Sequence, residues 1–271
     1  MAVTLREHTY QFTGTGKKVE CGYVTETEED MFYVGGMIFY IDETSDEIVE
    51  FFDQYGDPIE NVAVGDKPYC YRIVSRGESG KDKYYVYHDQ LFSSKRWTYY
   101  ENGAYVYNLL GTANGIGKGK SNTAIVMAAD DGKYITNDSN GYATIWYTLQ
   151  QMRVNLYGGC DDWFIPTRAE LEELRKAIGF VKQPSSDPAP EMTAGAVTGG
   201  TIAGVADGQV HSKAYDGNTT YYPSATKFLD TYIWSSSESS AQNAWLWNYG
   251  NQAWNYASKY NNDSFVAVRA F

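Results

Sequence analysis

Cysteine and histidine, the residues that most often hold metals or cross-link a chain, are scarce in this sequence. Its 271 residues include only three of each. Cys21, Cys70 and Cys160 are widely spaced and form no C-x-x-C pair, which predicts neither a zinc site nor a disulfide framework. The histidines show no H-E-x-x-H or related metal-binding pattern. We therefore expect plain buried or half-buried thiols, no metal site and no cofactor.

Positive charge and long apolar runs are also scarce. Lysine and arginine number 22 against 34 acidic residues, and the resulting net charge of −12 repels phosphate backbones and anionic membranes alike. No apolar run approaches the ~18 residues of a membrane-spanning helix. The opening "MAVTLREHTYQF" lacks the apolar core of a Sec-type signal peptide. We therefore expect no nucleic-acid partner and no membrane insertion.

Tyrosine and glycine are abundant instead, with 25 and 26 residues. This mix is typical of short strands joined by many turns, with few helices. The chain up to residue 82 is β-rich: we expect a hairpin around residues 14–16, a buried strand within 32–42 and an alternating strand at 69–73. The polar stretch 75–83 is the best candidate for a domain boundary.

The best local signal in the chain is a helix at 166–179, "PTRAELEELRKAIG". Thr167 at the N-cap and Glu170 at N3 form a capping box, and Gly179 suits the C′ position. The predicted buried stripe consists of Leu171, Leu174 and Ile178. Capping and a solvated helix face account for the carboxylates of Glu170, Glu172 and Glu173, so we assign them no acid–base role.

A second helix is expected at 144–157, where apolar residues recur near one face. These residues are Ile145, Leu149, Met152 and Leu156. In the preceding "NGIGKGKSNTAIVMA" (114–128), the "GKGKS" suggests a phosphate-binding loop, but Asn114 stands where that motif needs its first Gly. The residues that follow are β-branched, so we expect a Gly-rich loop entering a strand.

Composition changes twice in the C-terminal half. Residues 182–223 are rich in Pro, Ala, Gly and Ser, which predicts a long mobile insertion. Residues 248–263, "NYGNQAWNYASKYNND", are half Asn and Tyr, which suits neither a packed core nor a solvated helix face. The chain then ends in "SFVAVRAF", which we expect to be a buried closing strand with Arg269 paired internally.

Several of these stretches together carry a family resemblance. "GCDDWFIPTRAELEEL" (159–174), "IWSSSE" (233–238) and the final "VAVRAF" (266–271) resemble the C-type-lectin-fold variable proteins of diversity-generating retroelements, the family of the phage tropism determinants. The likeness covers roughly residues 84–271, or 33–271 with the earlier strands. It implies an α+β chain with a C-type lectin fold: two helices packed on short antiparallel sheets, many loops, and a β-rich N-terminal region.

The resemblance explains the Asn/Tyr-rich stretch. In such retroelements an error-prone reverse transcriptase alters template adenines, and randomised Asn codons yield Tyr, Asp, Ser, Ala, Gly, Leu and others, but never Trp or Lys. It implies a variable region at about 240–264. The predicted ligand-binding positions are Leu246, Asn248, Tyr249, Asn251, Asn255, Tyr256, Ser258, Tyr260, Asn261, Asn262 and Asp263.

Residues that Asn codons cannot yield are expected to form a constant scaffold between the variable positions, as Lys259 would. The predicted scaffold consists of Trp163, Trp234, Trp245, Trp247, Trp254 and Arg269. Trp245 and Trp247 are two residues apart, so they should share one face of a strand, with Leu246 and Asn248 on the other. Tyr, Ser, Asn and Gly are the residues that antibody paratopes use. The bland alternative is a set of Gly/Asn-rich turns over an aromatic core.

The sequence also departs from related families. The calcium-dependent sugar motifs E-P-N, Q-P-D and W-N-D are absent. Asp161 and Asp162 are weighed as cation ligands against a turn before Trp163, and the turn is favoured. The formylglycine-generating enzymes of this fold need a redox-active Cys pair near the C-terminus, whereas the last Cys here is Cys160. We therefore expect no enzyme.

The sequence-based interpretation divides the chain at 82–83. Residues 1–82 are a β-rich region, either an attachment module or the first strands of the fold, and residues 83–271 form the lectin-like domain. The expected function is binding of a protein ligand on a host or target cell surface. The chain is expected to act from a phage particle or a cell surface, and it could do so as a homo-oligomer. The alternative is a non-diversified structural phage tail or adhesin domain of the same fold.

Overall fold

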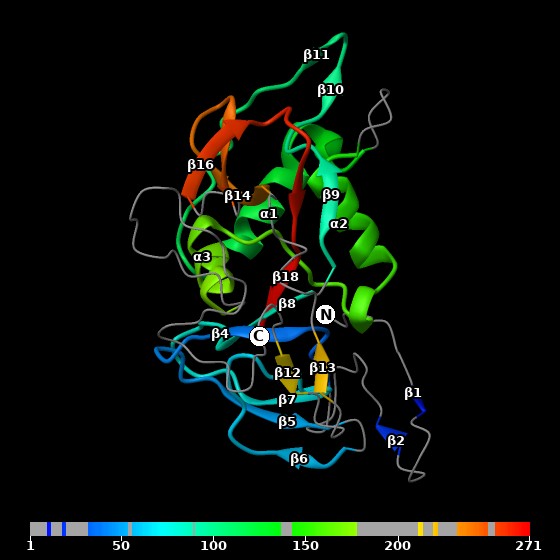
Figure 1. Ribbon diagram of the computed structural model, residues 1–271, viewed down its shortest axis with the longest axis vertical. Helices are drawn as coiled ribbons and strands as arrows, with labels where there is room; N and C mark the ends of the chain where they lie inside the picture. The colour runs from blue at the N-terminus through cyan, green and yellow to red at the C-terminus, as the bar shows by residue number, and fades with distance from the viewer. Residues whose placement is uncertain are drawn as a thin grey trace.

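The computed structural model describes residues 32–53, 56–88, 90–136, 143–177, 232–248 and 253–271, with the backbone of four short strands: β1 (Tyr10–Gln11), β2 (Lys18–Val19), β12 (His211–Lys213) and β13 (Thr219–Tyr221). These residues form an α+β fold with short, mostly antiparallel sheets (Figure 1). None of the helices among them is long and apolar enough to cross a membrane. The predicted insertion at 182–223 lies outside the described residues, apart from β12 and β13.

The middle of the molecule is a three-stranded sheet. Its order is β18 (Val268–Ala270), β8 (Tyr84–Tyr87) and β4 (Met37–Ile41), all antiparallel. The predicted buried strand within 32–42 is confirmed in β4. The predicted closing strand at 264–271 is only partly confirmed, because its residues are divided between β18 in this sheet and a separate strand, β17 (Asp263–Phe265), in another sheet. Because β18 comes from the end of the chain, the sheet joins residues about 230 positions apart.

A second sheet packs at one end of the molecule (Figure 1). Its order is β3 (Phe32–Tyr33), β7 (Cys70–Ser75), β5 (Ile48–Phe52) and β6 (Pro58–Ile59). One buried cluster joins Ile38, Phe51 and Tyr71 to Val86 and Phe271. The rings of Tyr71 and Phe271 stack with centroids 3.6 Å apart. The described residues before position 82 therefore share a core with residues after it.

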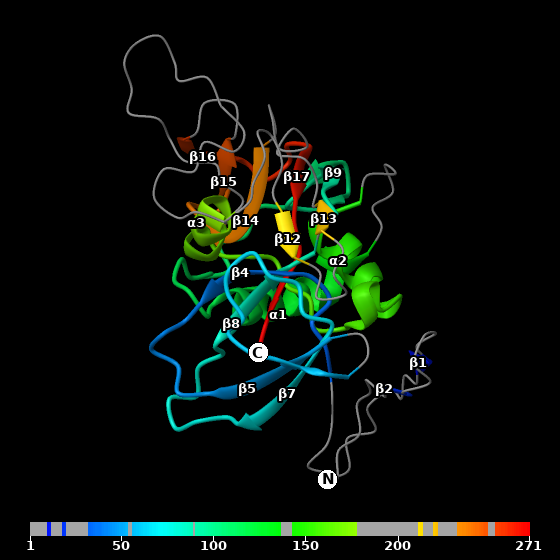
Figure 2. The ribbon, with the colours of Figure 1, turned by 60° about the horizontal axis from the view of Figure 1, so that its bottom comes forward.

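The third sheet, at the opposite end, has five strands (Figure 2). Its order is β16 (Ala253–Ser258), β15 (Asn243–Asn248), β14 (Tyr232–Glu238), β17 (Asp263–Phe265) and β9 (Phe92–Lys95). The β14–β17 pairing is parallel and the others are antiparallel. This sheet carries most of the Asn/Tyr-rich stretch.

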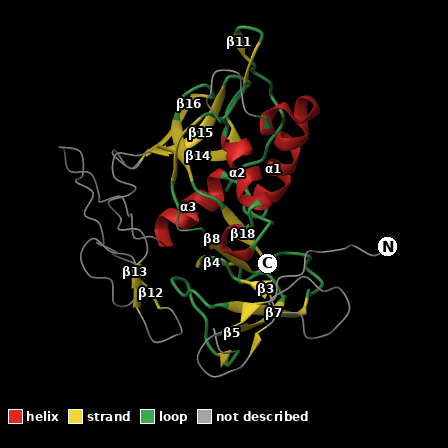
Figure 3. Cartoon of the chain, turned by 90° about the vertical axis from the view of Figure 1, so that its right-hand side faces the viewer, coloured by secondary structure: helices red, strands yellow, loops and turns green. Residues whose placement is uncertain are grey.

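Helices cover both faces of the five-stranded sheet. On one face, α1 (Gly119–Ala128) and α2 (Ile145–Val154) share a buried cluster with Trp234 and Leu246. On the other face, α3 (Arg168–Ala177) shares a cluster with Ile233 and Trp247. Figure 3 shows α1 and α2 beside this sheet. Short 3₁₀ segments follow the first two helices: η1 (Ala129–Ile135) and η2 (Tyr157–Gly159).

The helix predicted at 144–157 is confirmed in α2. The hydroxyl of Thr144 caps its start by accepting the Tyr147 N–H at 2.9 Å. Ile145, Leu149 and Met152 are buried as predicted. Leu156 falls outside the helix because the chain turns there with a left-handed φ of 52°.

The capping box of α3 is also confirmed. The backbone N–H of Glu170 donates to the Thr167 hydroxyl at 3.1 Å, and the carboxylate of Glu170 accepts the Thr167 N–H at 2.8 Å. Leu171 and Leu174 are buried, whereas Ile178 and Gly179 lie outside the described residues. The Glu170 side chain is fully buried, so its predicted capping role holds and it does not belong to the solvated face of the helix.

Glu170 is buried because it also binds the loop before α1. The same carboxylate accepts the N–H groups of Gly117 and Gly119 at 2.9 and 3.3 Å. Burial raises the pKa of Glu170 to about 7, although these hydrogen bonds act in the opposite direction. The backbone amides of Gly117 and Gly119, which belong to the "GKGKS" segment, are therefore already bound to the Glu170 carboxyl group. Lys120 pairs with Asp82 at 2.7 Å.

The strand predicted after this loop is wrong, since residues 119–128 form α1. Tertiary contacts override the β-branched composition here. A Cβ at Gly119 would collide with the Glu170 carboxylate and the Phe164 ring, so only glycine allows this approach. The Asn122 amide exchanges hydrogen bonds with Ala113, and the Thr123 hydroxyl accepts the Ile165 N–H.

The cysteines only partly follow the prediction of plain thiols. Cys160 is a free, buried thiol, and burial raises its pKa to about 12. Cys70 is disulfide-bonded, which corrects the prediction for that residue. Its partner lies outside the described residues. Spacing alone did not reveal this cross-link, because a single disulfide leaves no motif in the sequence.

Candidate functional site

The tryptophans of β15 line the face of the sheet that α3 covers. Trp245 meets Tyr256 edge to face at 5.8 Å, and Trp247 meets Trp254 at 5.3 Å. Each contact joins residues that are paired across β15 and β16. The prediction that Trp245 and Trp247 share one face is therefore confirmed.

Two arginines of α3 lie against these rings. The guanidinium carbon of Arg168 is 4.1 Å from the ring centroid of Trp245 and 5.0 Å from that of Trp254. Arg175 lies 4.8 Å from Trp247. Both positions are suited to cation–π attraction, which fixes the β15–β16 pair against the helix. Sequence reasoning missed this role, although Arg168 and Arg175 are two turns apart and therefore fall on one helix face.

Two of the predicted ligand-binding positions are buried. Leu246 is 1% exposed and packs among the core residues beneath the sheet. Asn248, at the end of β15, is 7% exposed. The alternation of β15 places Leu246 opposite its tryptophan neighbours, and α1 and α2 cover that side. Leu246 therefore cannot contact a ligand without disturbing the core, and we remove it from the set of candidate contacts.

The other predicted positions lie on the edge strand β16 and in the turn after it. Tyr256 is 62% exposed and Tyr260 is 46% exposed. Asn262 is also exposed, whereas the remaining described positions are half-buried: Asn255, Ser258, Asn261 and Asp263. Tyr249 and Asn251 lie outside the described residues. Strand β16 lies at the end of the molecule opposite the β3–β7–β5–β6 sheet (Figure 1).

Lys259 lies between the two exposed tyrosines yet is fully buried. Its Nζ is 2.6 Å from the Glu238 carboxylate, which is equally buried, and 2.7 Å from the Asn108 carbonyl. The ammonium also lies 4.3 Å from the ring centroid of Trp97. Burial lowers the pKa of Lys259, and Glu238 acts in the opposite direction. The expected scaffold role of Lys259 agrees with this burial.

The backbone of Lys259 holds the same position. Its carbonyl accepts the N–H groups of Trp97 and Thr98 at 3.0 and 3.1 Å, and its N–H donates to Gln242 at 2.9 Å. Glu238 in turn accepts the N–H groups of Leu110 and Thr112. The start of the turn is therefore fixed to three other segments of the chain.

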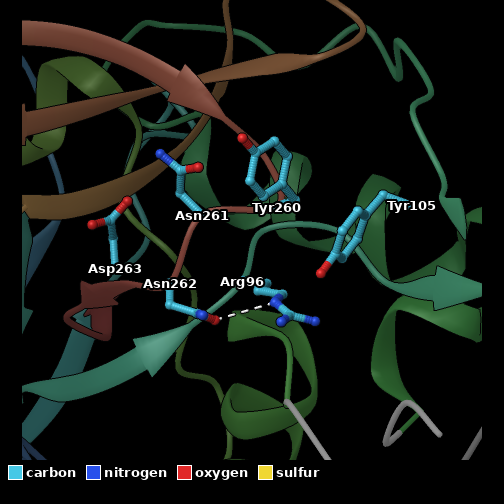
Figure 4. Close-up of a pocket in the computed structure, with 6 residues that line it drawn as sticks. All are labelled: Arg96, Tyr105, Tyr260, Asn261, Asn262 and Asp263. Atoms are coloured by element: carbon cyan, nitrogen blue, oxygen red, sulfur yellow. Dashed lines mark hydrogen bonds between the residues drawn. The ribbon is translucent and has the colours of Figure 1, made fainter. Parts of the chain in front are cut away.

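The turn after Lys259 forms one side of an open pocket of about 460 Å³ (Figure 4). The pocket is lined by Arg96, Tyr105, Tyr260, Asn261, Asn262 and Asp263. Four of these six residues were predicted as ligand-binding positions. The structure adds Arg96 and Tyr105, which come from the region of β9, β10 (Tyr100–Glu101) and β11 (Ala104–Tyr105).

A hairpin brings Tyr105 to the pocket. Strands β10 and β11 are joined by Asn102 and Gly103, whose φ angles of 51° and 85° suit a type I′ turn. The "ENGA" at 101–104 is a strong sequence signal for such a hairpin, and tyrosines flank it. This signal could have placed the hairpin, but only the fold places it beside the turn at 260–263.

Aspartate 263 is the acidic member of the pocket. Burial raises its pKa to about 6. Its strand neighbour in register is Lys95 on β9. In Figure 4 the Asp263 carboxylate and the Arg96 guanidinium lie on different sides of Asn262. The pocket thus contains both charge signs, held by separate strands.

The remaining predicted scaffold residues are buried. Trp163 and Trp234 donate their indole N–H groups to the carbonyls of Tyr157 and Lys95, at 2.8 and 3.2 Å. Arg269 pairs with Asp162, with Nε 2.8 Å from Oδ1, which confirms its predicted internal pairing. Asp162, which the sequence analysis weighed as a ligand of a metal cation, thus binds the guanidinium of Arg269.

This end of the molecule presents rings, amides, hydroxyls and two opposite charges. Within the described residues, no group of three or more His, Cys, Asp or Glu side chains is placed to hold a metal ion. Neither a protein-family model nor a curated protein matches the chain. Its function is therefore inferred from its own residues.

Proposed function

We propose that the chain is a ligand-binding protein with a C-type lectin fold, whose C-terminal Asn/Tyr-rich stretch is diversified by a retroelement. The exposed side chains of Tyr256, Tyr260 and Asn262, with the half-buried Asn and Ser beside them, recognise a partner on a host or target surface, and no reaction is catalysed. The chain acts from a phage particle or a cell surface.

The observation that carries the proposal is the division of the stretch by exposure. Among the described residues of the stretch, the large side chains that randomised Asn codons can yield, Tyr256 and Tyr260, are the most exposed rings. Trp247 and Lys259, which those codons cannot yield, are buried. Exposed tyrosines on a fixed support suit binding, because Tyr offers large amphipathic area at low conformational entropy cost.

The support beneath these residues is independent of their identity. The tryptophans are fixed by Arg168 and Arg175 of α3, and the turn is fixed by Lys259 and Glu238. Substitutions at Tyr256, Tyr260 or Asn262 therefore leave these contacts in place. Such separation of support from exposed side chains is what a diversified binding face requires.

The test is sequencing of the 3′ end of this gene from many cells of one population. We expect substitutions at adenines of the codons for 246–264, and a nearby near-repeat differing only at adenines. The codons for 84–177 are the internal control and should be constant. A clonal 3′ end without the repeat would overturn diversification and favour a fixed structural domain of a tail or adhesin.

The same sequences distinguish two reasons for a constant residue: a codon without adenine, and selection for a folded protein. Trp codons contain no adenine, so Trp245, Trp247 and Trp254 should be constant by the chemistry of copying. Lys codons do contain adenine, so changes at Lys259 arise but disrupt a buried ion pair. We therefore expect lysine at 259 among copies that encode folded protein, and loss of it among unselected copies.

A further inference from the structure

The pocket in Figure 4 contains a preformed aromatic platform. The rings of Tyr105 and Tyr260 stack with centroids 5.3 Å apart and an interplanar angle of 25°. The guanidinium carbon of Arg96 lies 5.0 Å from the Tyr105 centroid. Arg96 is in turn fixed by Asn262, whose side-chain oxygen accepts its Nε–H at 3.2 Å. Arg96 and Tyr105, which are distant from the turn in sequence, thus hold the exposed Tyr260 ring in one orientation together with Asn262 of the turn itself.

The charges of the pocket oppose each other and disfavour a charged ligand. A cationic group would be attracted by Asp263 and repelled by Arg96. An anionic group would be attracted by Arg96 and repelled by Asp263, and the net charge of −12 of the whole chain would repel it further. A purely apolar ligand would leave the amides and charges of the lining unsatisfied. A neutral ligand that carries both donors and acceptors satisfies both sides at once.

We propose that this pocket binds a neutral, hydroxyl-rich ring, such as a hexopyranose unit of a surface glycan. The C–H face of the ring lies on Tyr260, and its hydroxyls bond to the amides of Asn261 and Asn262 and to the carboxylate of Asp263. Hydroxyls fit this lining because each can both donate and accept a hydrogen bond. They can therefore donate to the carboxylate, which only accepts, and bond in either direction with the amides. The side chains bind the sugar directly. This inference rests on the proposed binding function and names the chemistry of its ligand.

The size of the pocket agrees with such a ligand. Its volume of about 460 Å³ lies within the ~300–1,000 Å³ of small-molecule sites. Its opening onto the exposed end of the molecule leaves room for the glycan to continue outward. Arg96 and Tyr105 lie outside the diversified stretch, so they form a constant half of the pocket, and the turn at 260–263 forms the half that changes.

The test uses the purified full chain and four probes: the methyl glycosides of glucose, galactose, mannose and N-acetylglucosamine. We expect at least one to bind in the millimolar range by saturation-transfer NMR, with the strongest transfer at ring C–H protons. Tyr260→Ala should weaken it by about fivefold or more, because the stacking surface is lost. Asp263→Asn should weaken it by a similar factor. Tyr232→Ala removes an exposed ring outside the pocket and is the matched control.

Circular dichroism and thermal unfolding establish that each variant is folded. Binding of a glycoside that Tyr260→Ala and Asp263→Asn weaken, and Tyr232→Ala does not, supports the proposal. Absence of binding to all four glycosides overturns it, as does binding that the two pocket variants leave unchanged. Binding of the neutral peptide acetyl-Asn-Gly-amide but of no glycoside also overturns it, in favour of a peptide pocket. Gene sequencing tests diversification separately, so either proposal can fail while the other stands.

Discussion

The ammonium of Lys259 and the carboxylate of Glu238 lie 2.6 Å apart with both side chains removed from solvent. The pair connects the end of β14 to the turn that follows β16. Two exposed tyrosines stand on either side of Lys259 along the chain, at 256 and 260. An ion pair in the core therefore fixes the backbone from which the proposed binding residues project.

Removal of one partner of this pair should be costly. Lys259→Met leaves the Glu238 carboxylate buried without its ion-pair partner, so we expect a loss of about 3 kcal/mol or more in the free energy of unfolding. Adding Glu238→Gln should recover part of this loss, because Gln is neutral and still accepts the Leu110 and Thr112 N–H groups. Urea unfolding gives both values. Lys176→Met, which breaks an exposed pair with Glu173, is the control and should cost less than ~1 kcal/mol. A double variant less stable than Lys259→Met would contradict this account.

Glu170 should make stability fall as pH rises. Its pKa is about 7 in the folded protein against an ordinary value of 4.5, so between these pH values the folded state holds a proton that the unfolded state releases. The stability contributed by this proton is present below about pH 4.5 and is lost as pH rises through about 7. A shift of this size corresponds to about 3 kcal/mol. We expect the wild type to gain stability relative to Glu170→Gln as pH falls across this window. A pH-independent difference between the two proteins would sink the assignment.

The pocket should bind a glycoside less well in acid. Protonation of Asp263, whose pKa is raised to about 6 by burial, converts its carboxylate from acceptor to partial donor. Lys95 on the adjacent strand, and Arg96, Tyr105 and Tyr260 in the lining, are the other titratable groups nearby. We expect affinity to fall as pH drops from about 7.5 to 5 in the wild type and to change little in Asp263→Asn. Carbon-detected NMR of the aspartates measures the pKa directly, and a signal near 6 that persists in Asp263→Asn would contradict it.

Truncation of Leu246 should cost more stability than truncation of Tyr256. Leu246→Ala opens a cavity beneath the five-stranded sheet and should cost about 2–5 kcal/mol. Tyr256→Ala removes an exposed ring and one edge contact with Trp245, so we expect less than ~1 kcal/mol. Denaturant unfolding measures both. Equal losses of stability in the two variants would contradict the division of this stretch into buried supporting residues and exposed residues.

Local signals in the sequence predicted the elements that depend on neighbours along the chain. The capping box of Thr167 and Glu170 and the apolar face of α2 are examples, because helix starts and faces are written within a few residues. The shared face of Trp245 and Trp247 follows from strand period alone.

Features that depend on distant segments could not be predicted in this way. The sequence predicts a strand where α1 forms, because the start of α1 depends on contacts with Phe164 and Glu170, about 50 residues later in the chain. The burial of Leu246 required knowledge of which face the helices cover. Arg96 and Tyr105 joined the pocket only through the pairing of β17 with β9.

The position of β18 has a consequence for how new versions of the protein arise. The residues proposed to vary end at 264, and the next seven complete the central sheet, with Phe271 stacked on Tyr71. A version whose altered stretch cannot turn correctly into β17 also misplaces the strand that joins the two ends of the molecule. Under the proposed diversification, an altered stretch must therefore allow the whole chain to fold before it can be presented to a target.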